Sequence, residues 1–356
     1  HGRDWSHHRG QQAGDPGLGD DRTGVDTHGG RRQWSAHPDR RPEPQQARFL
    51  GLAVDGEVQH LRSEIDRARD LRQHDIGVDH AGTGGRYPVE PDGALRWIDS
   101  SEFGDEPPVD AVFLAHTDTD LWTIRVEGLD GKTADPRRGA SRLDADEAGL
   151  LATALGILNW HATARFSPVN GSPTVPARGG WVRRNPETGI DEFPRTDPAI
   201  ITVVHDGADR ILLGRQAVWP DRWYSTLAGF VEPGESLEQC VIREVHEEVG
   251  ITVSEPRYLG SQPWPFPRSL MLGFSALGDP DEPLQFLDGE IGDAQWFTRT
   301  EVLEALDRGD EWLRGMPEPD NAGGAGADGE DAPRLLLPGS ISIARALVEA
   351  WARTPA

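Results

Sequence analysis

The stretch that decides the fold is GFVEPGESLEQCVIREVHEEVGI, which runs from Gly229 to Ile251. Glycine permits turn conformations and Pro233 fixes its own φ, so the stretch opens with a stiff loop. Ser236 is a good helix N-cap, and Gly250 suits the position just after a helix. The stretch therefore predicts a loop followed by a helix over 237–249.

The predicted helix carries three carboxylates on one face. Glu244, Glu247 and Glu248 lie three and four residues apart, which places their side chains side by side. Crowded carboxylates repel one another unless a cation sits among them, and hard oxygen ligands suit Mg²⁺ or Mn²⁺. Arg243 can reach back to Glu235 and brace the loop against the helix. A solvated acidic face is the ordinary alternative, but it does not explain why the glycines, the arginine and the carboxylates occur together.

The whole chain is acidic, with a formal net charge of −24 over 356 residues. Such a surface lacks the basic footprint of a protein that binds long nucleic acid, and it needs a metal wherever it handles phosphate. The single cysteine, Cys240, can form neither an internal disulfide nor a cysteine zinc site, and we expect a small buried helix residue. No apolar run is long enough to span a membrane and no signal-peptide pattern is present, which predicts a cytoplasmic protein.

Four parts are predicted along the chain. Residues 1–88 contain few aliphatic residues at their start and no core-forming pattern, so we expect a disordered extension or an overextended gene start. Residues 89–165 predict a small α+β domain. Residues 166–195 are a loop-rich connector, and residues 196–356 predict an α/β/α sandwich of strands and helices. The fold class is therefore α+β.

The predicted elements follow from hydrophobic periodicity. In the first two parts they are a short helix at 62–71, strands at 111–115 and 121–126, and a helix at 145–166. In the last part they are strands at 199–204, 210–213, 223–231, 257–260, 270–277 and 294–298, helices at 301–308 and 341–353, and a low-complexity loop at 317–333.

The connector contains two pairs of polar residues at knuckle spacing, Ser167 with Asn170 and Asn185 with Thr188. Cysteines at these spacings would predict a zinc ribbon. Ser, Asn and Thr do not hold structural zinc. We therefore expect a metal-free knuckle, held by turns and by packing of Trp181, and no structural zinc.

A second motif, SQPWPFPRS from Ser261 to Ser269, bears on the substrate. Its three prolines predict a rigid, extended segment from which Trp264 and Phe266 project. Such aromatic–proline segments often do no more than cover the edge of a core. A stiff aromatic platform soon after a carboxylate helix also suits a nucleobase or nicotinamide, since aromatic rings stack on planar groups of any identity.

Together the two motifs resemble the NADH pyrophosphatase family, the NudC-type branch of the Nudix hydrolases. The similarity runs from about Ala111 to Trp351, and it includes FPRTDPAII at 193–201, LAGFVE at 227–232 and PGSISIAR at 338–345. The resemblance implies hydrolysis of the diphosphate of NADH or NAD, giving AMP and reduced nicotinamide mononucleotide or NMN, and removal of NAD caps from RNA 5′ ends. It also implies Mg²⁺ or Mn²⁺ as cofactor and a homodimer.

The resemblance implies roles for individual residues as well. The metal ligands would be Glu244, Glu248, Glu290 and the carbonyl of Ala228, with Glu247, Arg243 and Glu235 completing the catalytic group. The dinucleotide site would be lined by Phe193, Phe230, Gln262, Pro263, Trp264, Pro265, Phe266, Pro267, Arg268, Ser269 and Ala344. Phe230 and Trp264 resemble the family's ring-stacking pair, in which the tryptophan can come from the partner subunit.

Two functions from different classes remain open. The first is the metal-dependent hydrolase, in which a glutamate of the cluster or Glu290 takes a proton from water as general base. The second is a catalytically silent Nudix module that senses a dinucleotide by binding it. A silent module has no reason to keep every carboxylate of the motif, and this chain keeps all of them, which favours the enzyme.

Overall fold

A mixed six-stranded sheet organises the C-terminal part of the chain in the computed structural model. The structure describes residues 47–53, 86–99, 108–126, 130–286, 289–310 and 334–354. The strand order is β13-β14-β10-β11-β15, and β12 pairs with β10 beside this path. The strands are β10 (Asp197–His205), β11 (Arg210–Gln216), β12 (Leu227–Phe230), β13 (Val253–Trp264), β14 (Ser269–Gly278) and β15 (Ile291–Thr298).

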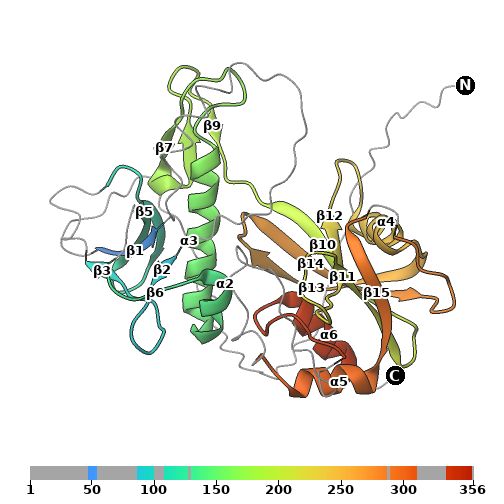
Figure 1. The fold of residues 1–356 in the computed structure, drawn as a ribbon. Coiled ribbons are helices and arrows are strands. Elements are labelled where there is room, and N and C mark those ends of the chain that lie inside the picture. Colours follow the sequence, from blue (N-terminus) through green and yellow to red (C-terminus); the bar gives the residue numbers. More distant parts are fainter. Residues whose placement is uncertain are drawn as a thin grey trace, which may run out of the picture. The chain divides into compact units, whose positions relative to one another are not determined.

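Helices cover both faces of this sheet (Figure 1). Successive strand residues point to opposite faces. Ile200 and Val204 of β10 therefore lie in one buried cluster with helix α4 (Leu237–Val249), whereas Val203 lies in another with α5 (Arg299–Asp307) and α6 (Ile343–Arg353). This three-layer arrangement confirms the predicted α/β/α sandwich.

Some predicted elements differ from the observed ones in length. The strand expected at 223–231 covers only β12, because the residues before it form isolated bridges, Ser225 with Gly214 and Trp223 with Leu336. The last helix begins at Ile343, where the Ser342 hydroxyl accepts from a backbone N–H. The helix expected at 62–71 and the loop expected at 317–333 lie outside the described residues.

The N-terminal part is built around helix α3 (Ala145–Thr163) and a four-stranded sheet of order β3-β1-β5-β4. These strands are β1 (Ala47–Ala53), β3 (Ile98–Asp99), β4 (Val112–His116) and β5 (Asp120–Val126), and the short pair β2 (Tyr87–Pro88) and β6 (Thr133–Ala134) precedes helix α2 (Pro136–Gly139). Buried residues of α3, including Leu151, Leu155 and Leu158, form one core with β4 and β5. The predicted α+β character is confirmed.

Strand β1 runs parallel to β5 over its whole length, from Ala47 opposite Asp120 to Ala53 opposite Val126. This strand lies inside residues 1–88, for which the composition predicts a disordered extension or an overextended gene start. Parallel neighbours need a long crossover connection, so their pairing is not visible in local composition. Part of the expected extension therefore contributes a strand to the N-terminal sheet.

The connector forms a small sheet of its own from β7 (Val175–Ala177), β8 (Val182–Arg184) and β9 (Asp191–Glu192). Trp181 donates its indole N–H to the carbonyl of Phe113 at 2.7 Å, which ties this sheet to the N-terminal part as the prediction of Trp181 packing required. None of the helices in the described ranges combines the length and the hydropathy that a membrane crossing requires.

Candidate active site

The predicted loop and helix are confirmed at both ends. Ser236 caps α4: its hydroxyl accepts from the Gln239 N–H at 3.2 Å, while the Gln239 side chain accepts from the Ser236 N–H at 3.0 Å. This reciprocal pair satisfies two of the N–H groups that a helix start leaves open. Gly250 ends the helix with φ of 79°, a left-handed conformation that glycine adopts without strain.

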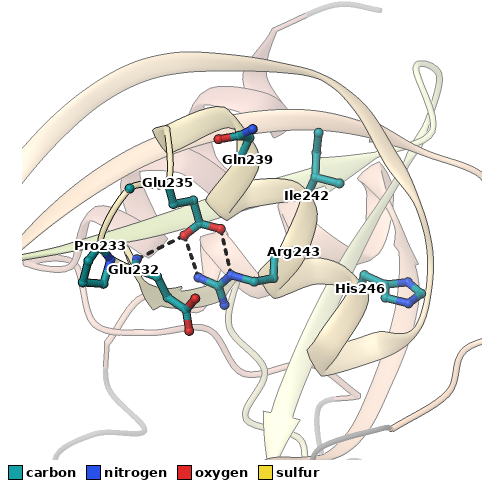
Figure 2. Close-up of a pocket in the computed structure, with 8 residues that line it drawn as sticks. Glu232, Pro233, Glu235, Gln239, Ile242, Arg243 and His246 are labelled. Carbon is teal, nitrogen blue, oxygen red and sulfur yellow. Dashed lines mark hydrogen bonds and ion pairs between the residues drawn. The ribbon is translucent and has the colours of Figure 1, made fainter.

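Arg243 holds the loop onto the helix, as predicted. Its guanidinium donates to both oxygens of Glu235 at 2.8 Å, and it also donates to the carbonyl of Phe230 at 2.9 Å. Figure 2 shows the two side chains facing one another, with the Glu235 carboxylate also accepting from the Glu232 N–H. Hydrogen bonds from Arg243 hold the pKa of Glu235 at about 2. Glu235 is thus an anionic brace rather than a proton carrier near neutral pH.

Arg243 also contacts two carboxylates of the predicted cluster, of which Glu244 is an expected metal ligand. It donates to Glu244 at 2.8 Å and to Glu247 at 2.9 Å, and these bonds contribute to raising its own pKa, with Glu235 the largest cause. Burial raises the pKa of Glu244, Arg243 opposes this effect, and the negative charges of Glu247 and Glu290 raise the pKa further. The helix face predicted from spacing is therefore a real cluster of interacting charges.

Gly229 makes room for this cluster. A Cβ built on Gly229 would lie well under 3.0 Å from the carboxylate atoms of Glu244, a distance that real Cβ atoms essentially never show. The Glu244 carboxylate therefore lies directly against the backbone of β12 at Gly229, and a larger residue there would require this side chain to move. Ala228, the expected carbonyl ligand, immediately precedes it on β12.

Glu248 is the most enclosed of the carboxylates, with 4% of its surface exposed. A carboxylate withdrawn from water is costly in its charged form unless a cation or hydrogen bonds compensate. Glu290 is exposed and accepts from the Gln216 side-chain amide at 2.9 Å. The donors on offer are all oxygens, so their chemistry fits a hard divalent cation.

The ligands are not gathered into a finished metal centre. In the part of the chain that the structure describes, no three His, Cys, Asp or Glu side chains form a group that could hold a metal ion. Two carboxylates of the predicted cluster, Glu244 and Glu247, form ion pairs with Arg243. Sharing a cation requires these side chains to turn away from the guanidinium.

A hollow of about 550 Å³ opens beside the loop, lined by Glu232, Pro233, Gly234, Glu235, Gln239, Ile242, Arg243 and His246. Figure 2 shows the labelled side chains around it. Ile242 and His246 lie two residues before and after Glu244, so they point to the opposite side of the helix. The hollow therefore shares only the Glu235–Arg243 brace with the catalytic group, and we assign no substrate to it.

The SQPWPFPRS motif is a hairpin rather than the expected extended segment. Its first part ends strand β13 at Trp264, which pairs with Ser269 at the start of β14, and the residues between them form the turn. The prediction of an extended segment is wrong because Pro265 and Pro267 lie in the turn. Proline's fixed φ also suits turn positions.

Two side chains of this motif are engaged within the protein. The amide of Gln262 donates to the Ile341 carbonyl at 2.8 Å and accepts from the Ile343 N–H at 2.8 Å, so it holds the start of α6. Arg268 pairs at 2.8 Å with Asp197, the first residue of β10. Their predicted contacts with a dinucleotide stay predictions, and any such contact must coexist with these bonds.

The aromatic residues expected at the dinucleotide site differ in exposure. Phe193 and Phe230 are 60% and 52% exposed, an unusual placement for large apolar rings that suits stacking on a ligand. Trp264 is half-buried and meets the Phe266 ring edge to face at 5.1 Å between centroids. Ala344 is only 2% exposed, and it packs with Ile201 and Leu347. Its side chain offers no surface to a ligand, so its predicted role needs its backbone.

Cys240 is fully buried, and burial raises the pKa of its thiol to about 12. A thiol of that kind stays protonated near neutral pH and is a poor nucleophile. The predicted placement of Cys240 as a small buried helix residue is confirmed.

Hydrogen bonds join three of the four knuckle positions of the connector, Asn170, Asn185 and Thr188, whereas Ser167 bonds within its own turn and to Glu192. Asn185 is fully buried. Its side-chain oxygen accepts from the Glu187 and Thr188 N–H groups, and its side-chain nitrogen donates to the Asn170 side chain at 2.7 Å. Ser167 accepts from the Val169 N–H at 3.3 Å. The two turns close with Gly171 donating to the Ser167 carbonyl and Gly189 to the Asn185 carbonyl, each at 2.8 Å.

Comparison with known proteins supports the two motifs. The NUDIX domain family matches residues 195–316, and the NADH pyrophosphatase zinc ribbon domain matches residues 162–193. An NAD-capped RNA hydrolase NudC of Mycobacterium bovis is 51% identical over 260 residues, covering 70% of this chain and 78% of that protein. This chain belongs to the NudC-type Nudix hydrolases.

Two more distant relatives are similar over a smaller share of their length. An NAD-capped RNA hydrolase of Schizosaccharomyces pombe is 39% identical over 229 residues, covering 59% of this chain and 56% of that protein. One from Homo sapiens is 35% identical over 227 residues, covering 61% and 44%. The chain is a Nudix hydrolase whose connector matches the NADH pyrophosphatase zinc ribbon domain and contains no cysteine.

Proposed function

We propose that this chain hydrolyses the diphosphate bond of NADH and NAD, releasing AMP together with reduced nicotinamide mononucleotide or NMN, and removes NAD caps from RNA 5′ ends. The observation that carries the proposal is the 51% identity to an NAD-capped RNA hydrolase over 260 residues. The complete carboxylate group, braced by Arg243, supports the hydrolase over the silent sensor. Glu244 and Glu248 are both withdrawn from water, and burying a carboxylate costs free energy, so their presence favours a function that uses them.

The residues divide the work of catalysis between them. Glu244, Glu248, Glu290 and the Ala228 carbonyl would hold Mg²⁺ or Mn²⁺, which when bound polarises a phosphoryl oxygen and lowers the pKa of its water. A carboxylate of this group would accept the proton from the attacking water. Arg243 would keep the loop and helix in register through Glu235, and it would release Glu244 and Glu247 when cation and diphosphate arrive.

The hairpin and the exposed phenylalanines would bind the two nucleosides. Trp264 and Phe230 would stack on planar rings, and Phe193 would extend that surface. Stacking of one base on an aromatic side chain contributes about 1–3 kcal/mol. The family resemblance further supports a homodimer, in which the stacking tryptophan can come from the partner subunit, and a cytoplasmic location. We also propose that the connector begins at residue 166 and the Nudix domain at residue 196.

Product analysis tests the function directly. Purified protein would be incubated with NADH, NAD or NAD-capped RNA in Mg²⁺ or Mn²⁺, and the products separated by chromatography. We expect AMP and the matching mononucleotide from the dinucleotides, and a 5′-monophosphate RNA from the capped substrate. Tight NADH binding without turnover under both metals would instead support the silent sensor.

We also propose that the connector works without zinc. Zinc prefers thiolate and imidazole ligands, whereas the donors at the four knuckle positions are hydroxyl and amide groups. Their hydrogen bonds close the same two turns that a metal would hold, and Asn185 contributes most of these bonds.

Elemental analysis of the purified protein is therefore expected to find no stoichiometric zinc. A quadruple variant, Ser167→Cys, Asn170→Cys, Asn185→Cys and Thr188→Cys, serves as the positive control and should bind zinc, because it restores the cysteine spacing. One zinc per wild-type chain would overturn the proposal.

Asn185→Ala should lower the free energy of unfolding by about 1–3 kcal/mol, measured by thermal unfolding, since it leaves buried polar groups unsatisfied.

A further inference from the structure

The turn of the SQPWPFPRS hairpin supplies few of its own hydrogen bonds. Pro265 and Pro267 have no N–H to donate. Phe266 donates its N–H to the Trp264 carbonyl at 2.8 Å within the turn. The carbonyl of Pro265, a buried residue, needs a donor because an unsatisfied backbone carbonyl away from water is costly, whereas Pro267 is exposed. The conformation of this turn therefore depends on groups outside the motif.

Asn159 of helix α3 supplies both donors. Its side-chain nitrogen donates to the Pro265 carbonyl at 3.0 Å and to the Pro267 carbonyl at 2.9 Å. Its side-chain oxygen accepts from Arg125 of β5 at 3.1 Å. This orientation is fixed chemically, because only the nitrogen can face two carbonyls and only the oxygen can face a guanidinium. One amide thus connects the N-terminal sheet to the hairpin.

Phe266 joins the hairpin to the N-terminal part at a second point. Arg137 of α2 lies over the Phe266 ring, 4.3 Å from its centroid, and the ring packs against the core cluster of α3. A cation over an aromatic face contributes about 0.5–2 kcal/mol. Within the hairpin, the ring of Phe266 also contacts the ring of Trp264 edge to face. Fixing Phe266 therefore restricts the ring of Trp264.

We propose that Asn159, assisted by Arg137, is a positioning residue that pre-forms the hairpin for the dinucleotide. The inference rests on the proposed function, in which this hairpin binds a nucleoside of NADH or NAD. A binding site that adopts its competent shape only part of the time has an apparent affinity lowered by that fraction. The N-terminal part would accordingly set the affinity for dinucleotide without touching the diphosphate chemistry.

The variant Asn159→Asp tests this directly in the full chain. The side chain keeps its size and still accepts from Arg125, but it presents oxygens to both proline carbonyls. We expect the KM for NADH to rise about ten-fold, the equivalent of two ordinary hydrogen bonds, with kcat within about two-fold of wild type. Thr163→Ala is the matched control, because its exposed hydroxyl bonds only within α3. It should change neither constant.

Hydrogen–deuterium exchange without substrate separates this proposal from the proposed function. Asn159→Asp should exchange faster in residues 262–269 while the peptide of helix α4 exchanges as in wild type. Arg137→Met should also increase exchange in residues 262–269, by a smaller amount. It provides a second variant if Asn159→Asp folds poorly. Unchanged exchange at 262–269 in both variants would overturn the positioning role, and so would an increase in exchange spread over the whole chain. Either result stands whether or not the protein hydrolyses NADH.

Discussion

Glu248→Gln is expected to reduce turnover of NADH by at least about a hundred-fold while the protein stays folded. Loss of a group that merely supports a metal ligand typically costs about 10–100-fold in affinity or activity, so loss of a ligand should cost more. The fold should survive because the amide has the shape of the carboxylate and removes a charge from a site that is only 4% exposed.

The measurement is kcat at increasing Mg²⁺ or Mn²⁺ together with thermal unfolding. Glu238→Gln is the matched control, since Glu238 is an exposed residue in the first turn of the same helix and lies outside the site. It should retain activity within about two-fold, as surface substitutions usually do. Near-normal turnover of Glu248→Gln at saturating Mn²⁺ would contradict the ligand assignment.

The parts of the fold that could be predicted are those fixed by neighbours in sequence. Helix α4 begins and ends where Ser236 and Gly250 indicated, because capping bonds form within four residues. The Glu235–Arg243 brace was also accessible, since both groups belong to one loop and helix. The order of strands and helices along residues 196–356 likewise predicted the α/β/α sandwich.

Contacts between distant segments could not be read from the sequence. The donation from Asn159 to the two proline carbonyls joins residues more than a hundred positions apart, and an asparagine in a helix carries no signal of its partner. The role of Gln262 at the start of α6 and the pairing of β1 with β5 are hidden for the same reason. Loop closure over such distances is decided by the whole fold.

Gly229→Ala is expected to lower activity strongly, because the added methyl group collides with the side chain of an expected metal ligand. The new methyl group would fall on the Glu244 carboxylate, so either that side chain must leave its place or β12 must move away from α4. Overpacking costs upward of about 1 kcal/mol of stability, and we expect the low end here because the clashing atoms are the far end of a flexible side chain. Activity should fall by about a hundred-fold or more, as expected when a metal ligand is displaced. The control is Gly260→Ala on β13, where an added Cβ has no neighbour within 4 Å.

A double-mutant cycle identifies the clash as the cause. If the methyl group collides with Glu244, removing that side chain should remove the penalty, so Gly229→Ala should cost almost no stability in a Glu244→Ala background. Residues in direct contact show interaction energies of about 0.5–3 kcal/mol in such cycles. Unfolding free energies of the wild type, the two single variants and the double variant supply the measurement, and activity is not needed. Additive costs would mean that Gly229 is required for the conformation of β12 itself. The close approach to Glu244 would then be a consequence of that conformation and not the reason for glycine.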